Sequence, residues 1–141
     1  MPNMRQQFAR GIGLGDILDY QNNRPKELGY IMGEHNGPGD AARHILGSYA
    51  LANKIGGIPA AAVTTGYEGL GKLFAEPNAE TSMDMHNNAL GRSLAERFDN
   101  PADAERALQT LMDYAAKYGL WNKQIENVPT WLPRNQQDKG Y

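Results

Sequence analysis

The chain of 141 residues contains no cysteine. This absence excludes a disulfide framework and a thiolate metal site, so a bound metal would need His, Asp or Glu as its ligands. An excess of basic residues is also missing, because 14 Lys and Arg stand against 16 Asp and Glu, for a formal net charge of −2. Nucleic-acid binding by counterion release needs a basic stripe, so we expect no nucleic-acid partner.

Long apolar segments are missing as well. The longest uncharged run, residues 55–67, consists mostly of Gly, Ala and Thr. A membrane-spanning helix needs about 20 apolar residues, so we expect no transmembrane segment. Residues 1–8 lack the continuous apolar region of a secretory signal, so we also expect no signal peptide.

The pattern that remains is that of an all-α protein. Its length allows one domain with a buried core, and apolar residues recur at helical spacing between glycines and prolines. We predict a compact helical bundle with glycine-interrupted helices, no strand, and a loop at residues 22–25. The expected helices cover residues 8–20, 40–55, 60–74, 82–98 and 101–118.

The end of the chain has a different pattern. We divide the chain into a helical domain, residues 1–119, and an irregular tail, residues 120–141. Trp121 and Trp131 lie among prolines in the tail, and such a segment has no apolar face of its own to pack on. The tail is therefore expected to lie extended on the domain or on a partner chain, with both tryptophans at least partly buried.

All three histidines lie in two short segments, residues 35–44 and 83–92. In the first segment, Asp40 and His44 are four positions apart, which places both side chains on one face of a helix at metal-like spacing. The motif core that contains both segments covers residues 35–98. This concentration of titratable groups makes the two segments the expected site.

The second segment adds polar residues to an apolar helical stripe. The helical wheel turns His86 and Asn87 inward and places Asp84 on an adjacent flank. Buried polar groups need partners, so we expect these residues to converge with His44, and Glu68 to arrive from the helix at 60–74.

Two kinds of chemistry fit such a cluster. One is a neutral histidine acting as general base beside an orienting carboxylate, and the other is a divalent metal such as zinc with an open coordination position. The candidate catalytic residues are His44, Asp84, His86 and Asn87. The candidate metal ligands are Asp40, His44, Glu68, Asp84 and His86.

Each of these residues also has a structural interpretation. Asp40 follows a Gly-Pro-Gly turn, where a helix N-cap is needed, and His44 fits a hydrogen-bonded core histidine. The adjacent His86 and Asn87 fit a purely structural network. Four further residues fit an exposed surface: His35, Arg43, Glu68 and Arg92. The two arginines are also suited to binding an anionic substrate group.

The two histidine segments resemble those of a poorly characterised bacterial and phage domain family. Its members carry N-G-P-x-D-A-x-R-H, then an acidic residue, often as His-Glu, and then M-D-x-H-N-N-x-x-G-R. This chain has the first motif at residues 36–44 and the second at 83–92. Its acidic residue would be Glu68, which follows Tyr67 where many members have His.

The resemblance implies site positions and a biological setting. Members occur as small phage proteins and as terminal modules of larger secreted or toxin-like bacterial proteins, which implies a phage or cell-envelope context. The positions that match the family pattern are Asp40, Arg43, His44, Asp84, His86, Asn87, Asn88 and Gly91.

Two functions of different classes follow. The first is a phage or prophage hydrolase-like domain acting on cell-envelope material, with His44 and His86 as base or ligands, Asp84 as carboxylate and Asn87 as polariser. The second is a non-enzymatic virion structural or ejection component, in which the polar cluster fixes helix register. Its partners would be phage structural proteins or further copies of the chain. A phage-encoded protein of either kind would be found in the virion or the host cytoplasm.

Overall fold

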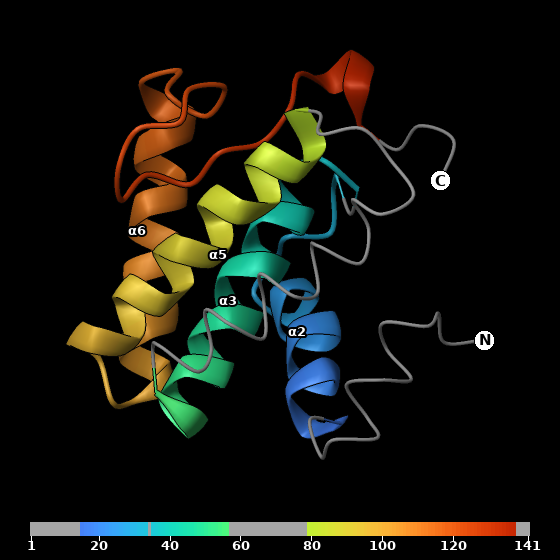
Figure 1. Ribbon diagram of the computed structural model, residues 1–141. Coiled ribbons are helices and arrows are strands. Elements are labelled where there is room, and N and C mark those ends of the chain that lie inside the picture. Colours follow the sequence, from blue (N-terminus) through green and yellow to red (C-terminus); the bar gives the residue numbers. More distant parts are fainter. Residues whose placement is uncertain (1–14, 34, 57–78, 138–141) are drawn as a thin grey trace.

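The computed structural model describes residues 15–33, 35–56 and 79–137 (Figure 1). Its elements are α2 (Gly15–Glu27), α3 (Pro38–Ile55), α5 (Ala79–Arg97), α6 (Pro101–Lys117) and the short 3-10 helix η1 (Arg134–Gln136). These described ranges contain no strand, so the predicted all-α fold is confirmed. Among the described helices, none combines the length and apolar character that a membrane span requires.

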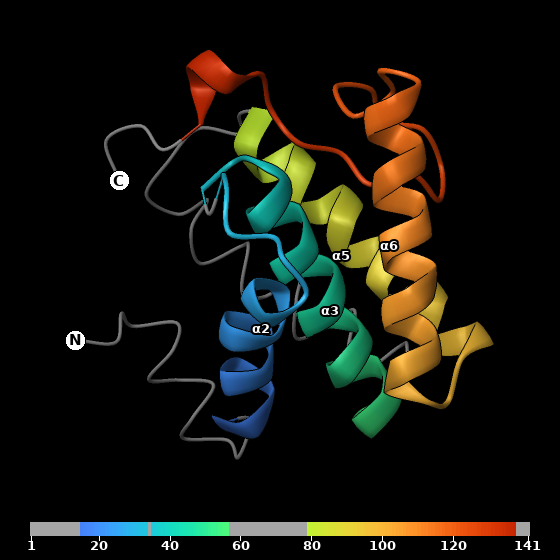
Figure 2. The same cartoon turned by 180° about the vertical axis from the view of Figure 1, so that it is seen from behind.

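Helix α3 organises the bundle. It packs most extensively against α5, also along α2, and makes a smaller contact with α6. Figures 1 and 2 show the α3 and α5 pair between α2 on one side and α6 on the other. The pairing of α3 with α5 brings the two histidine segments of the sequence side by side.

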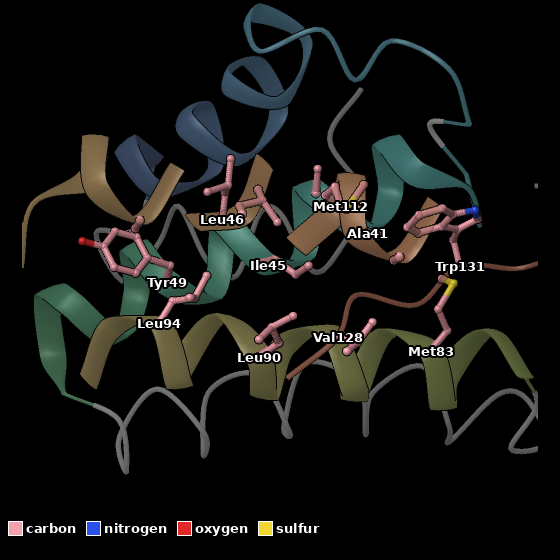
Figure 3. Close-up of a cluster of buried hydrophobic side chains, with 14 residues drawn as sticks. Ala41, Ile45, Leu46, Tyr49, Met83, Leu90, Leu94, Met112, Val128 and Trp131 are labelled. Atoms are coloured by element: carbon pink, nitrogen blue, oxygen red, sulfur yellow. The ribbon is translucent and has the colours of Figure 1, made fainter. Parts of the chain in front are cut away.

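The core lies where α3, α5 and α6 meet (Figure 3). Ile45 and Tyr49 of α3 face Leu90 and Leu94 of α5, and all four are at most 4% exposed. Full burial of one leucine or isoleucine side chain stabilises a fold by about 1.5–3 kcal/mol. The same cluster includes Leu108 and other residues of α6.

Three helices lie close to their predicted positions. Helices α3, α5 and α6 correspond to the expected 40–55, 82–98 and 101–118, with differences of up to three residues at their ends. Glycine and proline set several of these boundaries, as they often do at helix ends. The expected helix at 60–74 and the start of the one at 8–20 lie outside the described residues.

The loop predicted at residues 22–25 is wrong, because α2 continues through Pro25 to Glu27. Pro25 lies in the last turn, where its missing N–H removes only one helical hydrogen bond before the helix ends. The Arg24 guanidinium makes two hydrogen bonds of 2.9 Å to the carboxylate of Glu105 in α6, and the Tyr20 hydroxyl donates a third of 2.6 Å. These contacts between distant parts of the sequence stabilise the helix that local propensity disfavours.

Glu105 titrates differently from a free glutamate. Burial alone would raise the pKa of Glu105, but the hydrogen bonds from Arg24 and Tyr20 outweigh it and lower that pKa below its usual value. Burial, followed by the bond to Glu105, raises the pKa of Tyr20, which therefore stays a neutral donor.

Replacing Glu105 by glutamine is expected to lower the free energy of unfolding at neutral pH by about 1–2 kcal/mol. A carboxyl whose pKa is lowered by folding stabilises the protein above the unfolded pKa of about 4.3, and this contribution disappears as the pH falls through the lower folded value. The free energy of unfolding of the wild type should therefore fall between pH 5 and 3, and that of the Glu105→Gln variant should fall less over the same range, as measured by urea unfolding. Glu27→Gln is the control, since Glu27 contacts the same arginine at the surface and should change stability little. Equal effects of the two substitutions would contradict the assignment.

The segment after α6 crosses the bundle beside α5 (Figure 1). Val128 and Trp131 are each 7% exposed and belong to the core, while Trp121 is half-buried. The rings of the two tryptophans stack with centroids 5.8 Å apart, and the backbone N–H of Trp131 donates to the Trp121 carbonyl at 2.8 Å. Both tryptophans are thus at least partly buried, as predicted from the sequence.

Candidate functional site

Asp40, His44 and Asp84 come together where α3 faces α5. His44 Nε2 lies 3.2 Å from Asp84 Oδ1 and 3.5 Å from Asp40 Oδ1. One potential ligand atom from each residue lies within 4.8 Å of the other two. The side chains are 2% exposed for Asp40, 12% for Asp84 and 19% for His44. We call these three residues the Asp-His-Asp cluster.

Gly91 allows α3 and α5 to approach closely enough to form this cluster. A Cβ atom at Gly91 would overlap the carbonyl oxygen of Ile45 and come within 2.8 Å of Ser48 Cβ. Gly91 lies seven positions after Asp84, which is two helical turns along nearly the same face. The contact between the two backbones therefore also holds Asp84 against α3.

The other ring nitrogen of His44 is held by α5. His44 Nδ1 lies 3.1 Å from Asn88 Oδ1, and the Ser48 hydroxyl donates to the same oxygen at 2.9 Å. In the assigned orientation of the Asn88 amide, its oxygen can only accept, so His44 Nδ1 carries a proton. His44 Nε2 then faces two carboxylates, either as the second N–H of an imidazolium or as a lone pair.

Asp40 is not the helix N-cap that its position after Gly-Pro-Gly suggested. The N-cap is Gly37, and Pro38 occupies the first turn, where its fixed φ suits a helix start. Asp40 accepts the backbone N–H of Asn36 at 3.0 Å through Oδ2, and its Oδ1 contacts the Arg43 guanidinium. Its carboxylate is therefore fixed in orientation from two sides.

The structure does not bring His86 and Asn87 to the cluster. His86 Nε2 lies 2.7 Å from the Val128 carbonyl, and Asn87 exchanges hydrogen bonds of 2.8 and 3.0 Å with the backbone of Thr130. Both residues point toward the C-terminal segment because a helix turns about 100° per residue, and the face carrying Asp84 already meets α3. Their contacts are those of a structural attachment.

The remaining sequence candidates have other surroundings. Glu68 lies outside the described residues. His35 is partly buried, with Nε2 3.0 Å from Glu80 Oε1, so it links the loop before α3 to the start of α5. Arg92 is partly buried, and this burial lowers its pKa. Arg43 contacts the cluster through Asp40.

Sequence reasoning did not assign roles to Ser48 and Asn88, although their spacing offered a signal. Asp40, His44 and Ser48 follow one another at intervals of four in α3, and Asp84 and Asn88 repeat that interval in α5. Residues four apart share a helix face, so two such polar rows on facing helices form a ladder. The ladder is buried or partly buried along its length.

The Asp-His-Asp cluster has the donors of a metal centre. Two carboxylates and one imidazole are ligands of zinc and of other divalent transition metals, and three protein ligands leave a coordination position for water or substrate. Asn88 occupies the place of the outer partner that commonly orients a metal-binding histidine.

Comparison with known proteins adds a family. A family model described as a domain of unknown function matches residues 19–119, which include both histidine motifs. No curated protein and no solved structure matches the chain.

Proposed function

The chain belongs to the DUF6973 family, a domain of unknown function, and we propose, from the geometry of the Asp-His-Asp cluster, that it is a hydrolase-like domain that uses a divalent cation. Asp40, His44 and Asp84 are the proposed ligands, with zinc as the first candidate. The observation that carries the proposal is the position of His44 Nε2 beside two buried carboxylates while Nδ1 is engaged by Asn88. A cation bound there would lower the pKa of a water molecule and supply a nucleophile near neutral pH.

Electrostatics support a cation at this place. Two ionised carboxylates within reach of one imidazole repel each other, and their burial makes the charged forms costly. Arg43, with 36% of its side chain exposed, contacts Asp40 from the outside, whereas Asp84 pairs with His44. A divalent ion would balance both carboxylates at once and turn the His44 lone pair into a favourable ligand.

The chain's own residues would prepare the site for this chemistry. Asn88 holds the proton on His44 Nδ1 and so directs Nε2 toward the carboxylates, and Ser48 fixes the oxygen of Asn88. The backbone N–H of Asn36 occupies one oxygen of Asp40, which directs the other oxygen into the cluster. These hydrogen bonds within the chain hold the ligand atoms in place, which would reduce the cost of ordering them around an ion.

The proposed setting, a phage or cell-envelope protein acting on envelope material, comes from the motif resemblance. A second candidate function is a non-enzymatic virion component in which the cluster only fixes the register of α3 against α5. The observation that favours it is the pairing of charges within the fold: Asp40 contacts Arg43, and Asp84 contacts His44. Buried polar groups can serve such specificity without any catalytic role.

Zinc binding separates the two candidates. We expect the purified chain, dialysed without chelator, to retain about one zinc ion per chain by elemental analysis, as a three-ligand site predicts. His44→Gln and Asp84→Asn should each abolish this stoichiometric binding and the zinc-dependent hydrolysis of an activated ester such as p-nitrophenyl acetate. Removal of a ligand eliminates the site, whereas the helical fold should persist by circular dichroism.

His86→Gln is the matched control, because His86 contacts only the C-terminal segment among its assigned partners. It should keep zinc binding while lowering stability. Wild-type protein that binds neither zinc nor manganese, together with destabilised His44 and Asp84 variants, would reject the hydrolase proposal and support the structural function.

A further inference from the structure

A cavity of about 380 Å³ opens between the second half of α2 and the start of α3. Gln21, Asn22 and Lys26 of α2 form one wall, and Arg43 of α3 and His35 form another. Its volume is in the range of small-molecule sites, at the lower end. The cavity is therefore large enough for a small ligand.

The wall of the cavity favours an anion. Lys26 and Arg43 are cationic, and none of the described residues that line the cavity is acidic. Neutral donors add to them, because burial and the nearby Asp113 raise the pKa of Tyr30 to about 12 and keep its phenol protonated. His35 also lines the cavity, and its Nε2 lies 3.0 Å from Glu80 Oε1.

Arg43 connects this cavity to the Asp-His-Asp cluster. Its Nη2 contacts Asp40, and its side chain, 36% of which is exposed, lines the cavity. Guanidinium groups bind phosphate with paired N–H donors, so the exposed part of the Arg43 guanidinium could bind an anion in the cavity while Nη2 contacts Asp40. An anion bound to Arg43 would thus lie next to the cluster.

We propose that this cavity binds the phosphate group of a phosphorylated small molecule, and that such a molecule, for instance a phosphorylated precursor or fragment of envelope material, is the substrate of the neighbouring site. The identification as substrate rests on the proposed function, whereas the anion site rests on the cavity and its charges. Lys26 and Arg43 both line the cavity, and the tetrahedral oxygens of a phosphate can accept from both side chains, whereas a carboxylate offers only two oxygens in one plane. Enzymes commonly stabilise the charge that develops on a phosphoryl group with a divalent cation and an arginine together.

Inorganic phosphate is the probe for the first test. We expect isothermal titration calorimetry of the full chain, in the presence of a chelator, to show saturable phosphate binding. Lys26→Gln and Arg43→Gln should each weaken it at least tenfold, and Lys26→Arg should largely restore it. Lys54→Gln, at the exposed end of α3, is the matched control and should bind like the wild type.

The outcomes separate this proposal from the preceding one. Phosphate binding by a chain that never binds zinc would keep the anion site and reject the cation site. Zinc binding without saturable phosphate binding would reject the anion site alone. Phosphate is titrated up to 10 mM for this test, about ten times the 1 mM at the weak end of typical Michaelis constants. Equal weakening by Lys54→Gln and Lys26→Gln would also overturn it, because it would indicate general charge attraction.

Discussion

Replacing Gly91 by alanine is expected to lower the free energy of unfolding by about 2 kcal/mol or more and to separate Asp84 from His44. The added methyl group would overlap the carbonyl oxygen of Ile45, which belongs to the α3 backbone and cannot rotate away. The two helices must therefore move apart. The higher helix propensity of alanine, about 1 kcal/mol relative to glycine, offsets only part of this cost.

Gly47→Ala is the matched control, because Gly47 is likewise a glycine inside a helix, in this case α3, at a close contact with a neighbouring helix. A Cβ atom there would meet the end of the Gln21 side chain, which can adopt another rotamer, although Gln21 Cβ is 3.0 Å away. Its loss in urea unfolding at 25 °C should be clearly smaller than that of Gly91→Ala. Zinc retention should fall in the Gly91 variant only. A Gly91→Ala protein as stable as the wild type would show that α3 and α5 do not pack as closely as described.

Local patterns predicted most of the helices, and the tertiary contacts explain the exception. Apolar spacing and the glycine and proline boundaries place α3, α5 and α6 within about three residues of their observed ends. The end of α2 could not be predicted in this way, because Asn and Pro disfavour a helix there. Its stability depends on Glu105, which lies 81 positions from Arg24, and such a partner leaves no local signal.

The candidate site was predictable to a similar degree. The spacing of Asp40 and His44 placed them on one face, and the expected pairing with Asp84 across the two helices is observed. His86 and Asn87 were correctly expected to need partners, but α5 has two neighbours, α3 and the C-terminal segment. The apolar stripe does not indicate which neighbour each polar residue meets, so the sequence assigned both to the wrong one.

Trp131→Ala is expected to lower the free energy of unfolding by about 3–5 kcal/mol, the usual cost of truncating a buried aromatic side chain. Trp131 is 7% exposed and packs with Val128 in the core formed by α3, α5 and α6. Trp121→Ala is the matched control, because its half-buried ring stacks on the same side chain from the outside and should cost clearly less. Urea unfolding followed by circular dichroism measures both losses.

The same substitution should also weaken zinc binding, although Trp131 is not a ligand. The backbone N–H of Leu132, the next residue, donates to the Asn36 carbonyl at 2.7 Å, and the Asn36 N–H donates to Asp40 Oδ2 at 3.0 Å. Loss of the packed C-terminal segment removes the first of these bonds and frees the loop that orients Asp40. We expect a lower zinc affinity in Trp131→Ala than in Trp121→Ala under conditions where both remain folded. Identical affinities would show that the C-terminal segment stabilises the core without any influence on the Asp-His-Asp cluster.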